Sequence, residues 1–480
     1  MNSTLIDFYS LTMAQGYWKR HMDQKVVFEM FFRKQPYNGG FSIFAGLEPL
    51  LNSLQHFSFS PDDLEYLSGL GIFEEAFLSF LAGFRFTGAI FALDEGTMIF
   101  PNEPLIRIEG TLVESQLVEG MLLNTINFQT LIATKAARVW LASGKGTVME
   151  FGLRRAQGAD GALSASRAAY IGGAAGTSHV LAGKTFGIPV MGTMAHAWVM
   201  AFPTEEEAFH AYVDIYPKNP VFLIDTFNTL KSGAPNAIKI GKMLAEKGIN
   251  FGVRLDSGDI HYLSVEVRKM LDAAGLTKAT ISVSNDLDEL IIAALRAEGS
   301  PINVWGVGTK MVTGGGDSAF TGVYKLVMRD SGLGRLVPVM KLSDNPEKTT
   351  LPASKQVWRV RDSSGMAVAD VLGIDDPEHS DILEKGKTYT FWHTAGDYRH
   401  FQHTIEGDAI PLLKLRLESG KLTEEHPRLE EIRGKVRTEL ESFDGSYQRL
   451  LNPHTYKVSL TDQMKNLKLA LVEKQFQDFP

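Results

Sequence analysis

Between residues 148 and 310 the sequence alternates between strand-like apolar runs and stretches with helical features. The strand candidates begin near Val148, Val190, Val221, Ile249, Thr280 and Asn303. The helical stretches between them cover residues 163–184, 204–216, 234–248, 259–274 and 286–298. A spacing of about thirty residues with alternating type is typical of βαβ units and a parallel sheet. The pattern therefore predicts an α/β fold whose right-handed crossovers close or roll the sheet.

The strand candidates end in polar or charged residues. These are Arg154, His196, Asp225 with Asn228, Arg254 with Asp256 and Asp259, Ser284 with Asn285 and Asp286, and Thr309 with Lys310. Barrels and open α/β sheets both place their chemistry at the carboxyl edge of the strands. The sequence therefore predicts one shared site at this edge.

The composition limits the class of protein. The 480 residues suffice for two or three domains, and 44% apolar with 22% charged residues is typical of a globular protein. A net charge of −8 argues against non-specific nucleic-acid binding. The lack of cysteine excludes disulfides, thiolate catalysis and Cys-ligated metals, and fits a cytoplasmic protein. Without a signal peptide or a long apolar run, we expect no membrane association.

Two strand ends carry side chains suited to catalysis, each with a structural alternative. His196 follows an apolar run at the predicted edge, and its alternative is a buried histidine bonded to a backbone carbonyl. Asp259 is expected to cap the following helix, whereas Asp256 has no such structural task. A carboxylate at this position suits Mg²⁺ or ribose hydroxyls. His179 falls inside a predicted helix, so a structural role is expected for it.

Two glycine-rich turns follow the last of these strands. They contain Gly308 with Thr309, and Gly315 within the loop 314–316. Backbone N–H groups in such turns bind phosphate, although turns also need glycine for purely conformational reasons.

Lysine and aromatic residues allow further interpretations. Lys231, Lys310 or Lys325 would suit the Schiff base of an aldolase, and the alternative is a snorkelling or ion-paired lysine. Tyr9 and Phe151 could stack on a planar ligand or simply pack in a core.

Several short motifs, taken together and in order, resemble those of the nicotinate phosphoribosyltransferase family. They are DFYSLTM at 7–13, EFGLRR at 150–155, GTMAH at 192–196, LIDTF at 223–227, GVRLDSGD at 252–259, GVGTK at 306–310, GVYKLV at 322–327 and KLS at 341–343. The resemblance extends from the N-terminus to about residue 360 and is weaker beyond about residue 370.

The resemblance implies a type II phosphoribosyltransferase. The expected fold is an irregular (β/α) barrel with an α+β domain built from N- and C-terminal segments. We expect an N-terminal α+β domain over residues 1–143, a catalytic barrel over 144–335, and a C-terminal segment, 336–480, that partly returns to the N-terminal domain. Members of this family are homodimers with active sites at the subunit interface.

The implied reaction joins nicotinate to 5-phosphoribosyl 1-diphosphate and releases nicotinate mononucleotide and diphosphate, an entry step to NAD. ATP hydrolysis through a phosphohistidine drives it, and Mg²⁺ assists. The resemblance implies that His196 is phosphorylated and that Phe151 and Tyr9 sandwich the pyridine ring, with Tyr9 from the partner subunit. Arg254 and Thr193 match positions near nicotinate. The remaining implied contacts are Arg154 with an anion, Asp256 with the ribose, and Thr309 with the phosphoribosyl phosphate.

Ser178 bears on the choice of substrate. Related nicotinamide enzymes carry an acidic residue in the loop that here contains Ser178. A carboxylate there would accept a hydrogen bond from an amide and repel a carboxylate, whereas a serine can donate to a carboxylate. This position therefore favours nicotinate.

Three other functions stay open from the sequence. The first is a related phosphoribosyltransferase that uses nicotinamide or quinolinate, although quinolinate enzymes need more basic residues and are usually shorter. The second is a phosphate-binding barrel aldolase. The third is a barrel that binds nucleotide or phosphoribosyl diphosphate as a sensor.

Overall fold

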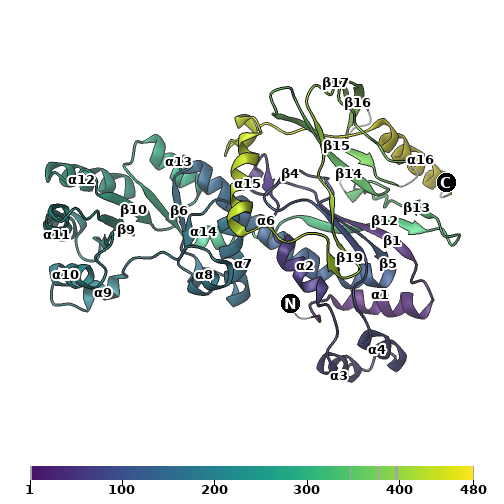
Figure 1. The fold of residues 1–480 in the computed structure, drawn as a ribbon, viewed down its shortest axis with the longest axis horizontal. Coiled ribbons are helices and arrows are strands. Elements are labelled where there is room, and N and C mark those ends of the chain that lie inside the picture. Colours follow the sequence, from purple (N-terminus) through teal and green to yellow (C-terminus); the bar gives the residue numbers. More distant parts are fainter. Residues whose placement is uncertain (1–2, 346–347, 377–378, 395–397, 479–480) are drawn as a thin grey trace. The chain divides into compact units, whose positions relative to one another are not determined.

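The computed structural model describes residues 3–345, 348–376, 379–394 and 398–478 (Figure 1). The chain divides into two compact units. We call residues 132–318 the half-barrel unit, and residues 1–131 with 319–480 the composite unit. No helix in the described ranges is long and apolar enough to cross a membrane.

The half-barrel unit contains a six-stranded sheet in the order β7-β6-β11-β10-β9-β8, in which all the neighbouring strands are parallel. Its strands are β6 (Thr147–Glu150), β7 (Gly176–Thr177), β8 (Val221–Leu223), β9 (Gly252–Leu255), β10 (Thr280–Ser284) and β11 (Val304–Val307). The sheet is strongly curled, which confirms the predicted α/β fold class. Short apolar runs suit these strands because a parallel sheet is buried on both faces.

Helices connect the strands of this sheet. They are α7 (Gly158–Ile171), α8 (Val180–Phe186), α9 (His196–Met200), α10 (Glu205–Ile215), α11 (Ala234–Glu246), α12 (Ile260–Ala273), α13 (Glu289–Ala297) and α14 (Thr309–Val312). The predicted helices at 204–216, 234–248, 259–274 and 286–298 are confirmed as α10 to α13. Asp259 caps α12 as expected, because its Oδ1 accepts from the backbone N–H of Tyr262 at 3.0 Å.

Two predicted elements in this unit were wrong. The helix expected at residues 163–184 is two helices, α7 and α8, with strand β7 between them. Helix α7 ends at Ile171 because Gly173 has a φ of +120°, which is incompatible with a continuing helix. The strand expected near Val190 is reduced to one parallel bridge with Thr177, since Pro189 has no N–H to donate to a ladder.

The composite unit combines N- and C-terminal segments, as predicted, in antiparallel and mixed sheets. One sheet has the order β13-β12-β1-β5-β3-β19-β20, another β17-β16-β21-β15-β14-β18, and a small one pairs β2 with β4. The first sheet contains β1 (Lys25–Phe32), β3 (Ala89–Ala92), β5 (Ile106–Thr111), β12 (Gly322–Asp330), β13 (Leu336–Pro338), β19 (Lys414–Glu418) and β20 (Lys421–Leu422). The others contain β2 (Ser42–Ile43), β4 (Met98–Ile99), β14 (Lys355–Arg361), β15 (Ala367–Ile374), β16 (Thr388–His393), β17 (His400–Thr404), β18 (Ala409–Pro411) and β21 (Val458–Leu460).

The helices of the composite unit are α1 (Phe8–Lys19), α2 (Leu47–Gln55), α3 (Pro61–Gly69), α4 (Glu75–Ala82), α5 (Leu112–Leu117), α15 (Leu429–Glu441) and α16 (Asp462–Asp478). Helix α6 (Glu119–Ala142) contributes residues to both units.

Strand β12 pairs antiparallel with β1, and Lys325 lies opposite Glu29 in that register. The range 144–335, which was expected to form the barrel, includes β12. This strand instead belongs to a sheet of the composite unit. Lys325 is therefore not at a strand end of the half-barrel sheet, which removes the structural basis for the aldolase interpretation at this lysine.

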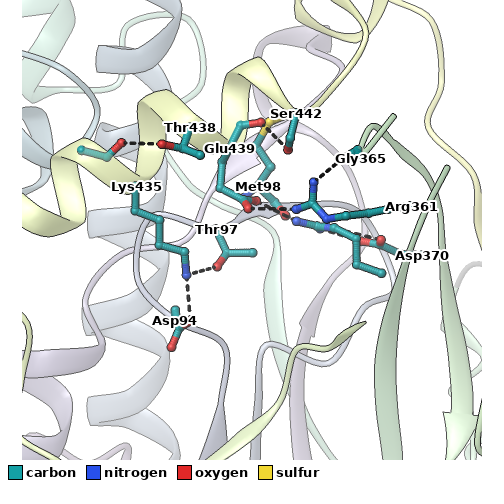
Figure 2. A network of polar contacts seen from close by, with 12 residues as sticks. Asp94, Thr97, Met98, Arg361, Gly365, Asp370, Lys435, Thr438, Glu439 and Ser442 are labelled. Carbon is teal, nitrogen blue, oxygen red and sulfur yellow. Dashed lines mark hydrogen bonds and ion pairs between the residues drawn. The ribbon is translucent and has the colours of Figure 1, made fainter. Parts of the chain in front are cut away.

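Ion pairs join the N- and C-terminal segments of the composite unit. Lys435 on α15 contacts Asp94 at 2.9 Å and donates to Thr97 at 3.0 Å (Figure 2). Burial raises the pKa of the Asp94 carboxyl, but Lys435, Arg416 and Lys414 outweigh it and hold this pKa well below its usual value. Asp94 therefore stays ionised and links α15 and β19 to the segment after β3.

Candidate active site

A cavity of about 310 Å³ lies at the carboxyl ends of strands in the half-barrel unit. It is lined by Phe151, Leu153, Arg154, Ser178, Gly192, Thr193, Met194, Ala195, His196, Arg254 and Asp256. These residues follow β6 and β7, lie in β9 or just after it, or belong to the segment that leads into α9. The parallel sheet thus brings segments far apart in the sequence to one edge. Four of the polar residues predicted at this edge line the cavity together, namely Arg154, His196, Arg254 and Asp256.

Arg254 is one of the two arginines that line the cavity, and several partners set its orientation. Its Nε donates to Ser284 Oγ at 2.9 Å, and its Nη1 donates to Thr193 Oγ1 at 2.6 Å and to the carbonyl of Met194 at 3.2 Å. Its Nη2 lies 3.2 Å from Asp256 Oδ1. These contacts fix the orientation of the guanidinium and leave one N–H of Nη2 to donate to a substrate carboxylate or phosphate.

His196 occupies the first position of α9 and has a carboxylate partner. Its Nε2 lies 3.2 Å from Oδ1 of Asp225, which follows strand β8. The Asp225 side chain is 1% exposed, and its Oδ2 accepts from the N–H of Asp256 at 2.9 Å and from Ser257 Oγ at 2.6 Å. The imidazole is 39% exposed, so it is held from one side and accessible from the other.

Asp225 is the functional candidate that the sequence alone did not single out. It was one of the polar strand-end residues, but nothing in its surroundings in the sequence assigned it a role. Its pairing with His196 links positions 29 residues apart through the order of the sheet and the start of α9. Its position directly after a buried strand was the available signal.

Phe151 forms an apolar wall of the cavity. Its ring packs against Gly306 and leaves no space for a side chain at that position. Its N–H donates to the carbonyl of Val307 at 2.9 Å. A Cβ added at Gly306 on β11 would lie 2.6 Å from ring Cδ2 of Phe151 and 3.3 Å from Cβ of Ser284. The ring therefore rests on bare backbone, and any larger residue at position 306 would displace it.

Ser178 lines the cavity next to the two-residue strand β7. Its N–H donates to the carbonyl of Glu150 at 3.0 Å. His179 is buried, with Nδ1 3.2 Å from Ser166 Oγ. It is the N-cap residue of α8, shortly after β7, and does not lie inside a helix as predicted. Arg154 lies exposed in a short 3₁₀ turn at Leu153–Arg155 and lines the same cavity.

The remaining predicted site residues do not line this cavity. Gly308 and Thr309 form the turn into α14, where a Cβ on Gly308 would lie 3.1 Å from the carbonyl oxygen of Phe151. Gly315 has a φ of +66° in the loop that follows. Tyr9 is half-exposed on α1 of the composite unit.

The described residues include no group of three or more His, Asp or Glu side chains arranged to hold a metal. Mg²⁺, however, is commonly bound through one or two carboxylates together with substrate phosphates. Asp256 is suited to this role, because Arg254 and Ser284 contact its Oδ1 and no described group bonds its Oδ2. The Asp225 carboxylate, in contrast, already uses both oxygens.

The fold and this cavity define an enzyme of the α/β-barrel class. Residues 4–127 match the N-terminal domain and residues 354–468 the C-terminal domain of nicotinate phosphoribosyltransferase. The chain is 41% identical to nicotinate phosphoribosyltransferase of Bacillus subtilis over 98% of its own length and 94% of that protein, and 33% identical to the human enzyme over 98% and 97%. It belongs to the nicotinate phosphoribosyltransferase family and is an enzyme of NAD salvage.

A solved structure of the same family agrees with this assignment, and a second one shares the fold. The crystal structure of human nicotinic acid phosphoribosyltransferase matches with a TM-score of 0.85 and 32% identity over 97% of this chain and 99% of that chain. A nicotinate-nucleotide pyrophosphorylase from Pyrococcus furiosus shares the fold, with a TM-score of 0.70 at 23% identity. The motifs resemble the family only weakly beyond about residue 370, but the match to the C-terminal family domain extends to residue 468.

Proposed function

We propose that this enzyme joins nicotinate to 5-phosphoribosyl 1-diphosphate and forms nicotinate mononucleotide and diphosphate. The observation that carries the proposal is that Arg254, Phe151 and Ser178 line one cavity. An oriented guanidinium, an aromatic face and a hydroxyl donor together suit a flat ring with a carboxylate. A carboxylate where Ser178 lies would accept from the amide of nicotinamide and repel nicotinate, whereas the serine hydroxyl can donate to a carboxylate. Comparable turnover of nicotinamide would contradict this choice of substrate.

For the chemical step we propose roles for residues of the cavity and for the turns after β11, which do not line it. Departure of diphosphate leaves a cationic, oxocarbenium-like ribose carbon, and the carboxylate of Asp256 stabilises that charge electrostatically. Arg154 and the turn at Gly308 and Thr309, with the loop at Gly315, supply donors for phosphate groups. Mg²⁺ bound through Asp256 would neutralise charge on the leaving diphosphate.

His196 is proposed to accept a phosphoryl group from ATP. An ionised Asp225 can only accept a hydrogen bond, so the proton of the neutral imidazole lies on Nε2, and the lone pair is on Nδ1. Nδ1 attacks the γ-phosphorus of ATP as the bond to ADP breaks. Hydrolysis of this phosphohistidine couples ATP to ribosyl transfer.

The second face of the pyridine site is proposed to come from Tyr9 of another subunit in a homodimer. Tyr9 is an exposed aromatic residue on α1, in the first motif that resembles the family. An aromatic ring opposite Phe151 would complete a stacking sandwich.

Labelled ATP provides the test of the coupled reaction. Purified wild-type protein incubated with γ-labelled ATP is expected to carry an acid-labile label, and the His196→Ala variant none. An unlabelled wild-type protein would refute the phosphohistidine, whereas label retained in the variant would assign it to another residue. Nicotinate mononucleotide formation, measured in the same samples, tests the ribosyl transfer independently.

The Gly306→Ala variant is expected to weaken nicotinate binding. The added methyl would displace the Phe151 ring, and such overpacking costs about 1–3 kcal/mol. The KM for nicotinate should rise while the KM for 5-phosphoribosyl 1-diphosphate stays unchanged in steady-state kinetics. Gly161→Ala on α7, where an added Cβ meets nothing within 4 Å, is the matched control and should behave as wild type. An unchanged nicotinate KM in Gly306→Ala would contradict the stacking role of Phe151.

A further inference from the structure

A fully buried carboxylate lies behind the cavity and takes no part in the proposed chemistry. Glu150 is the last residue of β6, and its exposed fraction is 0%. Its Oε1 accepts from the N–H of Gly152. Its Oε2 accepts from Ser166 Oγ at 2.8 Å and from Thr177 Oγ1 at 2.5 Å. One side chain therefore joins the end of β6, helix α7 and strand β7.

The residues next to these contacts are walls of the cavity. Phe151 lies between Glu150 and Gly152, the two ends of the short hydrogen-bonded turn. Ser178 follows Thr177, and its N–H donates to the Glu150 carbonyl at 3.0 Å. Glu150 is therefore bonded through its side chain to the neighbours of Phe151 and Ser178, and through its carbonyl to Ser178 itself.

A second layer of hydrogen bonds supports the hydroxyl groups around Glu150. Thr177 Oγ1 accepts from the N–H of His179 at 2.9 Å, and Ser166 Oγ lies 3.2 Å from His179 Nδ1. The three donors to the carboxylate are an amide and two hydroxyls, and all of them are neutral. Burying a carboxylate among neutral donors is costly unless each hydrogen bond is made, so the arrangement tolerates little displacement.

We propose that Glu150 is a positioning residue that sets the spacing between Phe151 and Ser178, and thereby both the affinity for the pyridine substrate and the preference for a carboxylate over an amide. This inference rests on the proposed function, because it assigns Phe151 and Ser178 to the pyridine site. Thr177 is the residue through which Glu150 acts on Ser178.

Thr177 offers the sharpest test because its hydroxyl can be removed with little change in shape. Thr177→Val deletes the hydrogen bond from Thr177 Oγ1 to the Glu150 carboxylate and the one that Oγ1 accepts from the His179 N–H. Loss of a hydrogen bond to a charged group corresponds to a change of about tenfold or more in an equilibrium constant. We expect the KM for nicotinate to rise about tenfold, the nicotinate-over-nicotinamide preference to fall, and the KM for 5-phosphoribosyl 1-diphosphate to stay unchanged. Thr177→Ser keeps the hydroxyl and should restore most of the wild-type values.

Two further variants separate positioning from a general loss of structure. Thr147→Val makes the same substitution at the exposed start of β6 and should leave both KM values unchanged. Glu150→Gln keeps the size but replaces one acceptor by a donor, so its nicotinate KM and its preference should change in the same direction as in Thr177→Val.

The outcomes are distinct. A wild-type nicotinate KM in Thr177→Val would overturn the inference while the proposed function stands. Equal rises in both KM values with a lowered Tm would also overturn it, since they indicate a merely structural role. If the wild-type protein itself does not join nicotinate to 5-phosphoribosyl 1-diphosphate, the proposed function fails, and this inference fails with it.

Discussion

The Asp225→Asn variant is expected to form phosphohistidine about 10²-fold to 10⁴-fold more slowly than wild type. The carboxylate accepts from Nε2 of His196 through Oδ1, while its Oδ2 accepts from the backbone of Asp256 and from Ser257. An asparagine has one side-chain oxygen, so it can accept either from His196 or from the donors of Asp256 and Ser257, but not from both. If its NH₂ faces His196, it demands an acceptor there, which moves the imidazole proton to Nδ1 and removes the attacking lone pair.

The measurement is the rate of label transfer from γ-labelled ATP to the protein, together with ³¹P NMR of the labelled enzyme to identify the phosphorylated nitrogen. We expect phosphate on Nδ1 in the wild type. Asp259→Asn is the matched control, because asparagine is as good a helix cap as aspartate and this residue caps α12 three positions beyond Asp256. Label transfer at the wild-type rate in Asp225→Asn, or phosphate on Nε2, would contradict the assigned geometry.

The Arg359→Met variant is expected to lower the free energy of unfolding by about 3–5 kcal/mol. The Arg359 side chain is 1% exposed and bonds Asp370 at 3.0 and 2.6 Å, Glu439 at 2.7 Å and the carbonyl of Met98 at 2.7 Å. Burial lowers the pKa of its guanidinium, but Asp370 and Glu439 outweigh this effect and raise that pKa well above its usual value. Without the arginine, Asp370 would be a buried charge that has lost its cationic partner.

Denaturant unfolding of both variants measures the effect, with Arg361→Met as the control. Arg361 lies two residues away on the same strand, is 20% exposed, and bonds the carbonyl of Gly365 at 2.7 Å (Figure 2). Its replacement should cost no more than about 1 kcal/mol. Removing Asp370 as well, in Arg359→Met with Asp370→Leu, should restore part of the loss. Equal losses for Arg359→Met and Arg361→Met would contradict the central role of the buried arginine.

Local features of the fold were predictable because neighbouring residues cause them. Ser60 caps α3, and Asp63, three positions later, completes a capping box. Helices α10 to α13 were predicted from sequence patterns that also extend over only a few residues. The helix predicted at 163–184 was wrong because periodicity does not reveal that Gly173 has a left-handed backbone, and the strand near Val190 was wrong because Pro189 has no N–H to donate to a ladder.

The sequence predicted which edge of the sheet carries the candidate site, but it did not predict which side chains contact one another there. The polar residues after the strands located His196, Arg254 and Asp256 correctly in one cavity. Their individual partners were not visible, and Thr309 and Gly315, predicted from the same edge, do not line that cavity. Which of the strand-end residues meet depends on sheet order, and β6 lies between β7 and β11 rather than beside β8.

By itself, the sequence determined the α/β class, the edge that carries the site, and the resemblance to a family of enzymes. These follow from periodicity, caps and short motifs, which act over a few residues or one turn. Only the tertiary structure decided that Asp225 holds His196 and that Glu150 holds Thr177, pairs separated by 29 and 27 residues. The physical reason is that a hydrogen bond requires atoms about 3 Å apart, and the packing of non-sequential strands alone brings these groups to that distance.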